Sequence, residues 1–265
     1  MSKGKIRAGI GGWIFEPWRG VFYPDDLKQK DELSYASRHL TAIEINSTYY
    51  SSQKPATFAK WRDETPEGFM FSVKASRYCT NRRVLAEAGE SIDKFVTQGV
   101  TELGDRLGPI VWQFMATKKF DPDDFEAFLK LLPRKQDGLA LRHVMEVRSD
   151  TFSTPDFIAL CRKHDVAICL ADHETFPLIP DVTSDLVYAR LMTGVDEVPT
   201  AYHPAEIKRW AERFETYAAG GVPDDLHLVA KEAAPRKPRD VFAFFIHEGK
   251  VRAPAAAQAL IKTLE

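Results

Sequence analysis

The chain has 265 residues, of which 44% are hydrophobic, and its charges nearly cancel at a net of −2. This length suits one α/β barrel domain, and the small net charge argues against nucleic acid or an anionic membrane surface as a partner. No apolar stretch reaches the roughly 20 residues that cross a bilayer, and the N-terminus lacks the apolar core of a signal peptide. We therefore expect a cytoplasmic protein in which residues 1–265 form a single domain.

Apolar segments typical of buried strands alternate with amphipathic segments typical of helices along the whole chain. Strands are expected at residues 6–12, 41–46, 69–75, 109–114, 141–148, 166–172, 185–191 and 240–246. Helices are expected at residues 31–40, 56–64, 91–107, 121–133, 154–164, 204–221 and 253–265. Strands that alternate with helices indicate a parallel sheet joined by crossovers, and the number eight predicts a (β/α)8 TIM barrel.

Five of these strands carry charged residues at or near their C-terminal ends, namely Glu44, Lys74, Glu146, Arg148, Asp172 and Arg190. An ionised group inside a buried strand is costly unless it is paired or faces a polar pocket. Because side chains alternate along a strand, we expect Glu44 to point into the barrel while Ile43 and Ile45 pack outward. Active sites of TIM barrels lie at the C-terminal ends of the strands. The pattern therefore predicts a charged layer at this end of the barrel, with Asp172 at its rim.

The same residues are also consistent with a purely structural network, because three acids face three bases and can neutralise one another. Buried ion pairs of this kind often stabilise a protein no better than apolar side chains would. A barrel that needed only stability would therefore be expected to carry Val or Ile at these positions. Titratable groups gathered in this way are typical of functional sites, and we favour a functional cluster.

The loop after the first strand, residues 11–24, is rich in aromatic side chains. Such rings can stack on a sugar or a base, or they can form an apolar plug over the end of the barrel. Trp13 is the best candidate for a ligand contact, because Gly11 and Gly12 before it permit close approach. The run from Ser47 to Tyr50 adds hydroxyl groups and two more rings at the same rim.

Two histidines, His173 and His247, also follow strands directly. Together with Glu44, Glu146 and Asp172 they could compose a site for a divalent metal ion with mixed oxygen and nitrogen ligands. Positive charge from Lys74, Arg148 and Arg190 would crowd that site, so a metal is not favoured. The sequence has no motif for an organic cofactor.

The three cysteines have neither the spacing of a zinc motif nor that of a disulfide framework. Cys79 lies near Arg82 and Arg83, a setting that can lower the pKa of a thiol. No general base at a catalytic spacing accompanies it, so a cysteine nucleophile is a minor hypothesis.

Several segments in order along the chain carry a family resemblance: GGW…FYP, EINSTYY, PEGFMFSVKAS, LGPIVWQF, EVRSDTF, LAD, VYARL and the final FFI…AP. In order and wording they resemble the domain-of-unknown-function family 72, the YecE-like proteins, over nearly the whole chain. The resemblance implies a TIM barrel related in description to sugar isomerases, with no established reaction. It places the motif residues of the family on Trp13, Glu44, Asn46, Tyr49, Lys74, Gln113, Glu146, Arg148, Asp172 and Arg190.

The chain departs from the family pattern at three positions. Ser149 stands where the family often has His, and Asn81 stands where a His often follows Thr. The closing strand ends in Phe245, Ile246 and His247 rather than in Phe and Asn. A mechanism that relies on those family side chains is therefore not carried over, although His247 could supply the hydrogen bond of the missing amide.

The leading hypothesis is an enzyme that acts on a small polar or anionic substrate, such as a sugar, a sugar phosphate or a related hydroxy-carbonyl compound. Arg148 and Arg190 would hold an oxygen of the substrate, and Glu44 or Glu146 would act as the general base. Lys74 would act as the acid or oxyanion partner, with a Schiff-base role less favoured. The substrate-binding residues would be Trp13, Asn46, Tyr49, Gln113 and His247.

Two alternatives use the same end of the barrel. One is a metal-dependent phosphodiesterase or nuclease whose ligands would be Glu44, Glu146, Asp172 and His247. The other is a non-catalytic small-molecule sensor or binding protein. Fold alone does not choose among them, because this barrel hosts many unrelated chemistries, and the sequence carries no signature of an oligomeric state.

Overall fold

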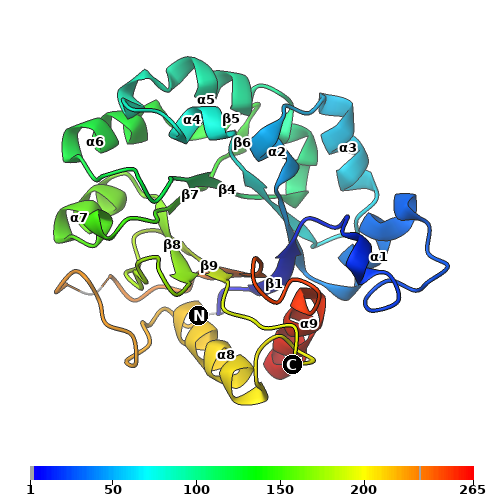
Figure 1. Ribbon diagram of the computed structural model, residues 1–265. Coiled ribbons are helices and arrows are strands. Elements are labelled where there is room, and N and C mark those ends of the chain that lie inside the picture. Colours follow the sequence, from blue (N-terminus) through cyan, green and yellow to red (C-terminus); the bar gives the residue numbers. More distant parts are fainter. Residues whose placement is uncertain (1–2, 233) are drawn as a thin grey trace.

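Eight parallel strands close into a barrel in the computed structural model, which describes residues 3–232 and 234–265 (Figure 1). Around the barrel the strand order is β1-β10-β9-β8-β7-β4-β3-β2. The strands are β1 (Ile6–Gly11), β2 (Ala42–Ile45), β3 (Met70–Lys74), β4 (Leu107–Gln113), β7 (His143–Glu146), β8 (Ala167–Asp172), β9 (Leu186–Leu191) and β10 (Asp240–Phe245). The predicted TIM barrel is confirmed. A separate antiparallel pair, β5 (Lys135–Gln136) and β6 (Leu139–Ala140), was not foreseen.

Helices surround the barrel as an outer layer (Figure 1). The α-helices are α1 (Glu32–His39), α2 (Ser47–Tyr50), α3 (Pro55–Asp63), α4 (Arg77–Thr80), α5 (Gly89–Val96), α6 (Pro122–Leu131), α7 (Pro155–Lys163), α8 (Pro204–Ala218) and α9 (Ala253–Leu264). Short 3-10 helices are η1 (Glu16–Trp18), η2 (Gln29–Asp31), η3 (Leu85–Glu87), η4 (Val100–Arg106) and η5 (Asp150–Phe152). Within the described residues, no helix combines the length and apolarity that a membrane span requires.

Local sequence explains where the helices begin. The Asp121 carboxylate accepts hydrogen bonds from the backbone N–H groups of Asp123 and Asp124, and so caps α6. Thr154 caps α7 in the same way, through the N–H of Phe157. Such caps satisfy donors that have no partner within the helix.

The prediction of a single long helix over residues 91–107 is wrong. Helix α5 ends at Val96, and η4 follows after Gly99, whose φ is +111°. A Cβ at Gly99 would lie 2.6 Å from the Cα of Pro55, so the helix α3 packs against a position that only glycine can occupy. Glycine readily adopts this backbone conformation, and the chain therefore turns where the apolar periodicity suggests continuity.

Two apolar cores lie on opposite faces of the barrel wall. Side chains such as Ile43 and Ile45 pack in the larger core between strands and helices. Inside the barrel, Val144, Phe242 and Phe244 belong to a second apolar cluster. The expected alternation around Glu44 is thus observed, and it sends the polar strand-end residues into the upper interior.

Candidate functional site

Arg190 joins two carboxylates at the top of the barrel interior. Its Nη2 lies 3.0 Å from Oε1 of Glu44, and its Nη1 lies 2.6 Å from Oε2 of Glu146. The second oxygen of Glu146 accepts two hydrogen bonds from Arg148, at 2.9 Å from Nε and 2.8 Å from Nη2. The carboxylate side chains of Glu44 and Glu146 are 0% exposed. The predicted charged layer therefore exists, with Arg190 at its centre.

Glu44 has a second partner besides Arg190, a buried tyrosine that the sequence analysis did not identify. The Tyr188 hydroxyl donates to Oε2 of Glu44 at 2.6 Å, and Ser72 Oγ lies 2.8 Å from the same hydroxyl. Tyr188 is two residues before Arg190 on β9, so both side chains point into the barrel. That spacing was a usable signal in the sequence.

The charges of this layer set its protonation states. Burial by itself raises the pKa of Glu146, but Arg190 and Arg148 outweigh this effect and lower the pKa to about 2. Burial disfavours the charged form of Arg190, yet Glu146 and Glu44 reverse this and raise its pKa. Glu146 therefore stays ionised, and its two oxygens are committed to arginines. A general base needs a pKa nearer the working pH, which argues against the role first expected for Glu146.

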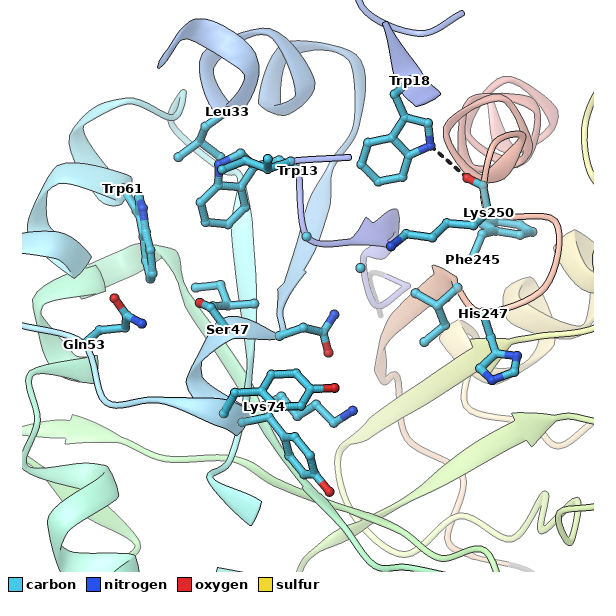
Figure 2. Close-up of a pocket in the computed structure, with 18 of the residues that line it drawn as sticks. Trp13, Trp18, Leu33, Ser47, Gln53, Trp61, Lys74, Phe245, His247 and Lys250 are labelled. Atoms are coloured by element: carbon cyan, nitrogen blue, oxygen red, sulfur yellow. Dashed lines mark hydrogen bonds between the residues drawn. The ribbon is translucent and has the colours of Figure 1, made fainter. Parts of the chain in front are cut away.

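A cavity of about 1140 Å³ opens above the charged layer. Figure 2 shows Trp13 and Trp61 on one side of it, His247 and Lys250 on the other, and Lys74 between the two sides. The predicted residues that line it are Trp13, Asn46, Tyr49, Lys74, Gln113, Arg148, Arg190 and His247. Glu44 and Glu146 lie beneath this lining, and Asp172 lies outside it.

The cavity presents cations to a ligand. Lys74, Arg148 and Arg190 reach its surface, whereas the two carboxylates that balance part of their charge do not. Lys74 is 8% exposed, and its Nζ lies 4.6 Å from the centre of the Tyr49 ring. Burial, followed by the charge of Arg190, lowers the pKa of Lys74 to about 8. The arrangement suits an anionic group on a ligand.

Gln113 adds a hydrogen-bond acceptor to the same cavity. Its side chain is buried, and among the described residues its Oε1 has no hydrogen-bond donor. Buried polar atoms nearly always have a partner in native proteins. A hydroxyl or N–H group of a ligand would supply the missing donor.

The aromatic loop contributes both to the cavity lining and to an apolar cluster. Trp13 lines the cavity and packs edge-on against Trp61 with 5.1 Å between ring centres. Tyr23 is 1% exposed and packs against Phe22 and Tyr35 in an apolar cluster. Its hydroxyl donates to the backbone oxygen of Trp13 at 2.6 Å. The apolar cluster around Tyr23 thereby positions Trp13, the residue of this loop that was predicted to contact a ligand.

Asp172 and His247 have separate surroundings. Asp172 Oδ2 accepts a hydrogen bond of 2.8 Å from Thr193 and lies 3.5 Å from the Tyr202 hydroxyl. His247 has a φ of +77° and its Nδ1 lies 2.9 Å from a carboxylate oxygen of Glu248. In residues 3–232 and 234–265 no three His, Cys, Asp or Glu side chains are grouped to hold a metal ion. Such a group is therefore not formed, within these described residues, by the five side chains considered for a metal site, namely Glu44, Glu146, Asp172, His173 and His247.

The pKa of Cys79 and two of the lining residues differ from what the sequence predicted. Burial raises the pKa of Cys79 to about 12, the opposite of the lowered value that its arginine neighbours suggested. Trp61 comes from α3 and Lys250 from the loop after β10, so neither follows the strand-end pattern that located the other lining residues. No signal in the sequence marked these two positions.

Comparison with known proteins gives matches at low sequence identity. UPF0759 protein YecE of Escherichia coli (strain K12) is 30% identical over 111 residues, which cover 40% of this chain and 40% of that protein. UPF0759 protein YunF of Bacillus subtilis (strain 168) is 32% identical over 78 residues, which cover 29% of this chain and 27% of that protein. The chain thus matches about two fifths or less of the length of these curated relatives.

Solved structures share the fold over the full chain. A DUF72 family protein from Enterococcus faecalis V583 has a TM-score of 0.70 at 18% identity and covers 100% of this chain and 99% of its own. One from Thermotoga maritima MSB8 has a TM-score of 0.68 at 22% identity and covers 97% of each chain. SacUVDE is more distant, with a TM-score of 0.54 at 11% identity over 98% of each chain.

A family model described as "Protein of unknown function DUF72" matches residues 7–265. This match includes every strand-end residue of the charged layer and nearly all of the barrel. The chain belongs to the DUF72 family.

Proposed function

We propose that this protein is an enzyme that binds a small, polar, anionic substrate in the cavity at the C-terminal end of the barrel. The observation that carries the proposal is the arrangement of charge. The three cations of the charged layer line the cavity, and the two carboxylates of the layer lie beneath them. The other charged lining residues are three lysines and one glutamate, namely Lys30, Lys60, Lys250 and Glu64. A ligand therefore meets a positive surface, whatever the net charge of the chain.

The substrate class follows from the other lining groups. Gln113 accepts a hydrogen bond from a hydroxyl, and Trp13 and Trp61 offer apolar surfaces to the carbon skeleton. Aromatic rings beside polar groups are typical of sugar-binding sites. A sugar phosphate or a related hydroxy-carbonyl compound combines an anionic group, hydroxyls and a short carbon chain, and so satisfies all of these groups.

The roles of the residues differ in one respect from those expected at first. Arg148 and Arg190 hold the anionic or carbonyl oxygen, and Lys74, with its pKa lowered to about 8, exchanges protons near neutral pH. Glu44 and Glu146 fix the orientation of the arginines through the ion pairs described above. Preorganised cations of this kind stabilise charge that develops in a transition state.

Calorimetric titration with inorganic phosphate and with sugar phosphates tests the binding step. Arg148→Gln removes one cation from the cavity, while Glu146 keeps Arg190 as a partner. A charge-assisted hydrogen bond contributes about 1.5–3 kcal/mol, so the affinity should fall about ten-fold or more.

Arg213→Gln is the matched control for this variant. Arg148 makes a two-pronged pair with Glu146 and lies over the ring of Phe176 at 4.6 Å. Arg213 likewise makes a two-pronged pair with Asp225 and lies over the ring of Trp210 at 4.5 Å. It lies on α8 outside the cavity lining, so its loss should leave anion affinity unchanged. Equal effects of both substitutions, or no anion binding by the wild type, would contradict the proposal.

Turnover separates an enzyme from a non-catalytic binding protein. The wild type and Lys74→Met should be incubated with a mixture of phosphorylated sugars, and the compounds followed by mass spectrometry. We expect the wild type to convert one compound into a product and Lys74→Met to leave it unchanged. A ligand that is retained and released unaltered by the wild type would instead identify a binding protein.

A further inference from the structure

Among the three cations of the charged layer, Lys74 is the one that has no ion-pair partner in the described residues. Among the described residues, no hydrogen bond or ion pair involves its Nζ, whereas Arg148 and Arg190 each pair with a carboxylate. The nearest defined contact is the face of Tyr49. A buried amine without a partner is costly, and this one faces an open cavity rather than apolar packing.

The partners of the two glutamates explain why Lys74 has no ion pair among the residues that the structure describes. Glu44 uses its oxygens on Arg190 and Tyr188, and Glu146 uses its oxygens on Arg190 and Arg148. Burial and the charge of Arg190 bring the pKa of Lys74 to about 8. About a tenth of the lysine is then a neutral amine at pH 7, and only the neutral amine is a nucleophile.

The backbone of Lys74 is held firmly. It lies at the end of β3, in register with Val111 of β4, and its carbonyl oxygen accepts a hydrogen bond of 2.7 Å from Thr48. The amine therefore extends from a well-anchored strand end into the cavity that Arg148 and Arg190 also line. Catalytic groups are most accurately placed on such elements.

We propose that Lys74 forms an imine with the carbonyl carbon of a small anionic aldehyde or ketone, while Arg148 and Arg190 hold the carboxylate or phosphate of the same molecule. This inference rests on the proposed function and names its chemistry. An amine placed beside other cations and partly removed from water is an activated nucleophile. The amide oxygen of Gln113, which can accept a hydrogen bond from a hydroxyl group, then favours a hydroxylated carbonyl compound.

The reaction needs no other reactant. The nitrogen lone pair of neutral Lys74 forms a bond to the carbonyl carbon, and the carbonyl π electrons move to oxygen, which takes up a proton. The nitrogen of the resulting carbinolamine releases a proton, and the hydroxyl takes up a proton and leaves as water as the nitrogen lone pair forms the C=N bond. The nitrogen of this product still carries one hydrogen, so the product is the iminium itself. Counting the proton that Lys74 releases to become neutral, the sum is one lysine ammonium and one carbonyl compound converted into one iminium and one water.

Lys250 provides an internal comparison. It also lines the cavity, but it lies on the loop after β10, and its Nζ is over the ring of Phe15 at 4.1 Å. Burial alone lowers the pKa of Lys250, whereas the charges of Arg190 and Arg148 also contribute to the shift at Lys74. Imine formation should therefore occur at Lys74 in preference to Lys250.

Reductive trapping tests the inference. The wild type is incubated with pyruvate or with dihydroxyacetone phosphate in the presence of sodium cyanoborohydride, which adds hydride to an iminium and fixes it as a secondary amine. Peptide mapping by mass spectrometry then locates the modified lysine. We expect modification at Lys74 with at least one of the two ketones, its loss in Lys74→Arg, and protection by the non-carbonyl analogues lactate and glycerol 3-phosphate.

The outcomes separate the two proposals. Binding of lactate or glycerol 3-phosphate without any Lys74 adduct from either ketone would overturn the imine and leave the anion site in place. Modification of Lys250 or of surface lysines at the same rate as Lys74 would also overturn it. If none of the four compounds binds and no adduct forms, both the imine and the proposed function fail. Mapping in the wild type keeps the test valid even if Lys74→Arg does not fold.

Discussion

The two ends of the barrel interior carry similar charges in opposite arrangements. At the N-terminal end, Arg7 and Arg142 lie 3.5 and 3.4 Å from Asp240, and both lie over the ring of Phe242. There the carboxylate is the most exposed of the three, at 31%. At the C-terminal end the carboxylates of Glu44 and Glu146 are 0% exposed, and the cations lie above them.

The comparison shows that charge count alone does not mark a site. Each cluster has one cation more than it has carboxylates, counting Lys74 at the upper end. The difference is which group is buried. At the N-terminal end the acid is nearer solvent than its two arginines. At the C-terminal end the acids lie beneath cations that line the cavity, and the proposed anion site rests on this arrangement. The following substitutions compare the two ends.

The largest expected effect is the loss of the central arginine. Arg190→Met leaves two buried carboxylates without their shared cation, which should reduce the free energy of unfolding by about 3–5 kcal/mol. Arg7→Met at the other end leaves Asp240 paired with Arg142, so a loss of about 1–2 kcal/mol is expected. Urea denaturation of both variants measures the difference. Equal losses would contradict the distinction between the two ends.

Acid should weaken the upper cluster. The pKa of Glu146 is about 2 in the folded protein, against an ordinary value of 4.5. Its contribution to stability, roughly 3 kcal/mol, is present above about pH 4.5 and is lost as the pH falls toward 2. Unfolding free energies measured over this range should fall more steeply for the wild type than for Glu146→Gln. Parallel curves would show that the arginines do not hold this carboxylate ionised.

The hydroxyl of Tyr188 should matter more than that of another buried tyrosine. Tyr188→Phe removes a hydrogen bond to the buried carboxylate of Glu44, with an expected loss of about 1–3 kcal/mol. Tyr217→Phe removes a bond of 2.9 Å to the neutral backbone oxygen of Pro180, with an expected loss of about 1 kcal/mol. Thermal and urea denaturation of the pair tests this order. A larger loss for Tyr217→Phe would contradict it.

The smallest effect is expected at Asp172. Its carboxylate contacts Thr193 and Tyr202 outside the cavity lining. Asp172→Asn keeps an oxygen for these contacts and should change anion affinity by less than about two-fold, within the usual range for distant sites. Calorimetry on the variant decides. A loss as large as that of Arg148→Gln would place Asp172 in the ligand site.

Strand alternation explains why the sequence predicted most of the site. Once eight strands were recognised, the position of Glu44 between Ile43 and Ile45 determined which face it occupies, and Arg190 followed from the same rule. The helix break at Gly99 depends on contact with Pro55, which is distant in sequence. Local periodicity carries no information about such a contact.

The chemistry of the site was less predictable than its location. Glu146 is on β7 and Arg190 on β9, two strands away around the barrel, so their pairing depends on three-dimensional spacing. That pairing lowers the pKa of Glu146, and among the described residues Lys74 has no ion-pair partner. Lys250 and Trp61 enter from a loop and a helix, where no periodicity points to the cavity.

The most direct test of the central claim is the pH dependence of lysine reactivity. The claim is that Lys74 lies unpaired beside Arg190 in a positive cavity. Competitive labelling with a small acylating reagent, read out by peptide mass spectrometry, gives the pKa of each reactive lysine. We expect half-maximal reactivity of Lys74 near pH 8, and a pKa at or above the ordinary lysine value of 10.5 would contradict this placement of Lys74.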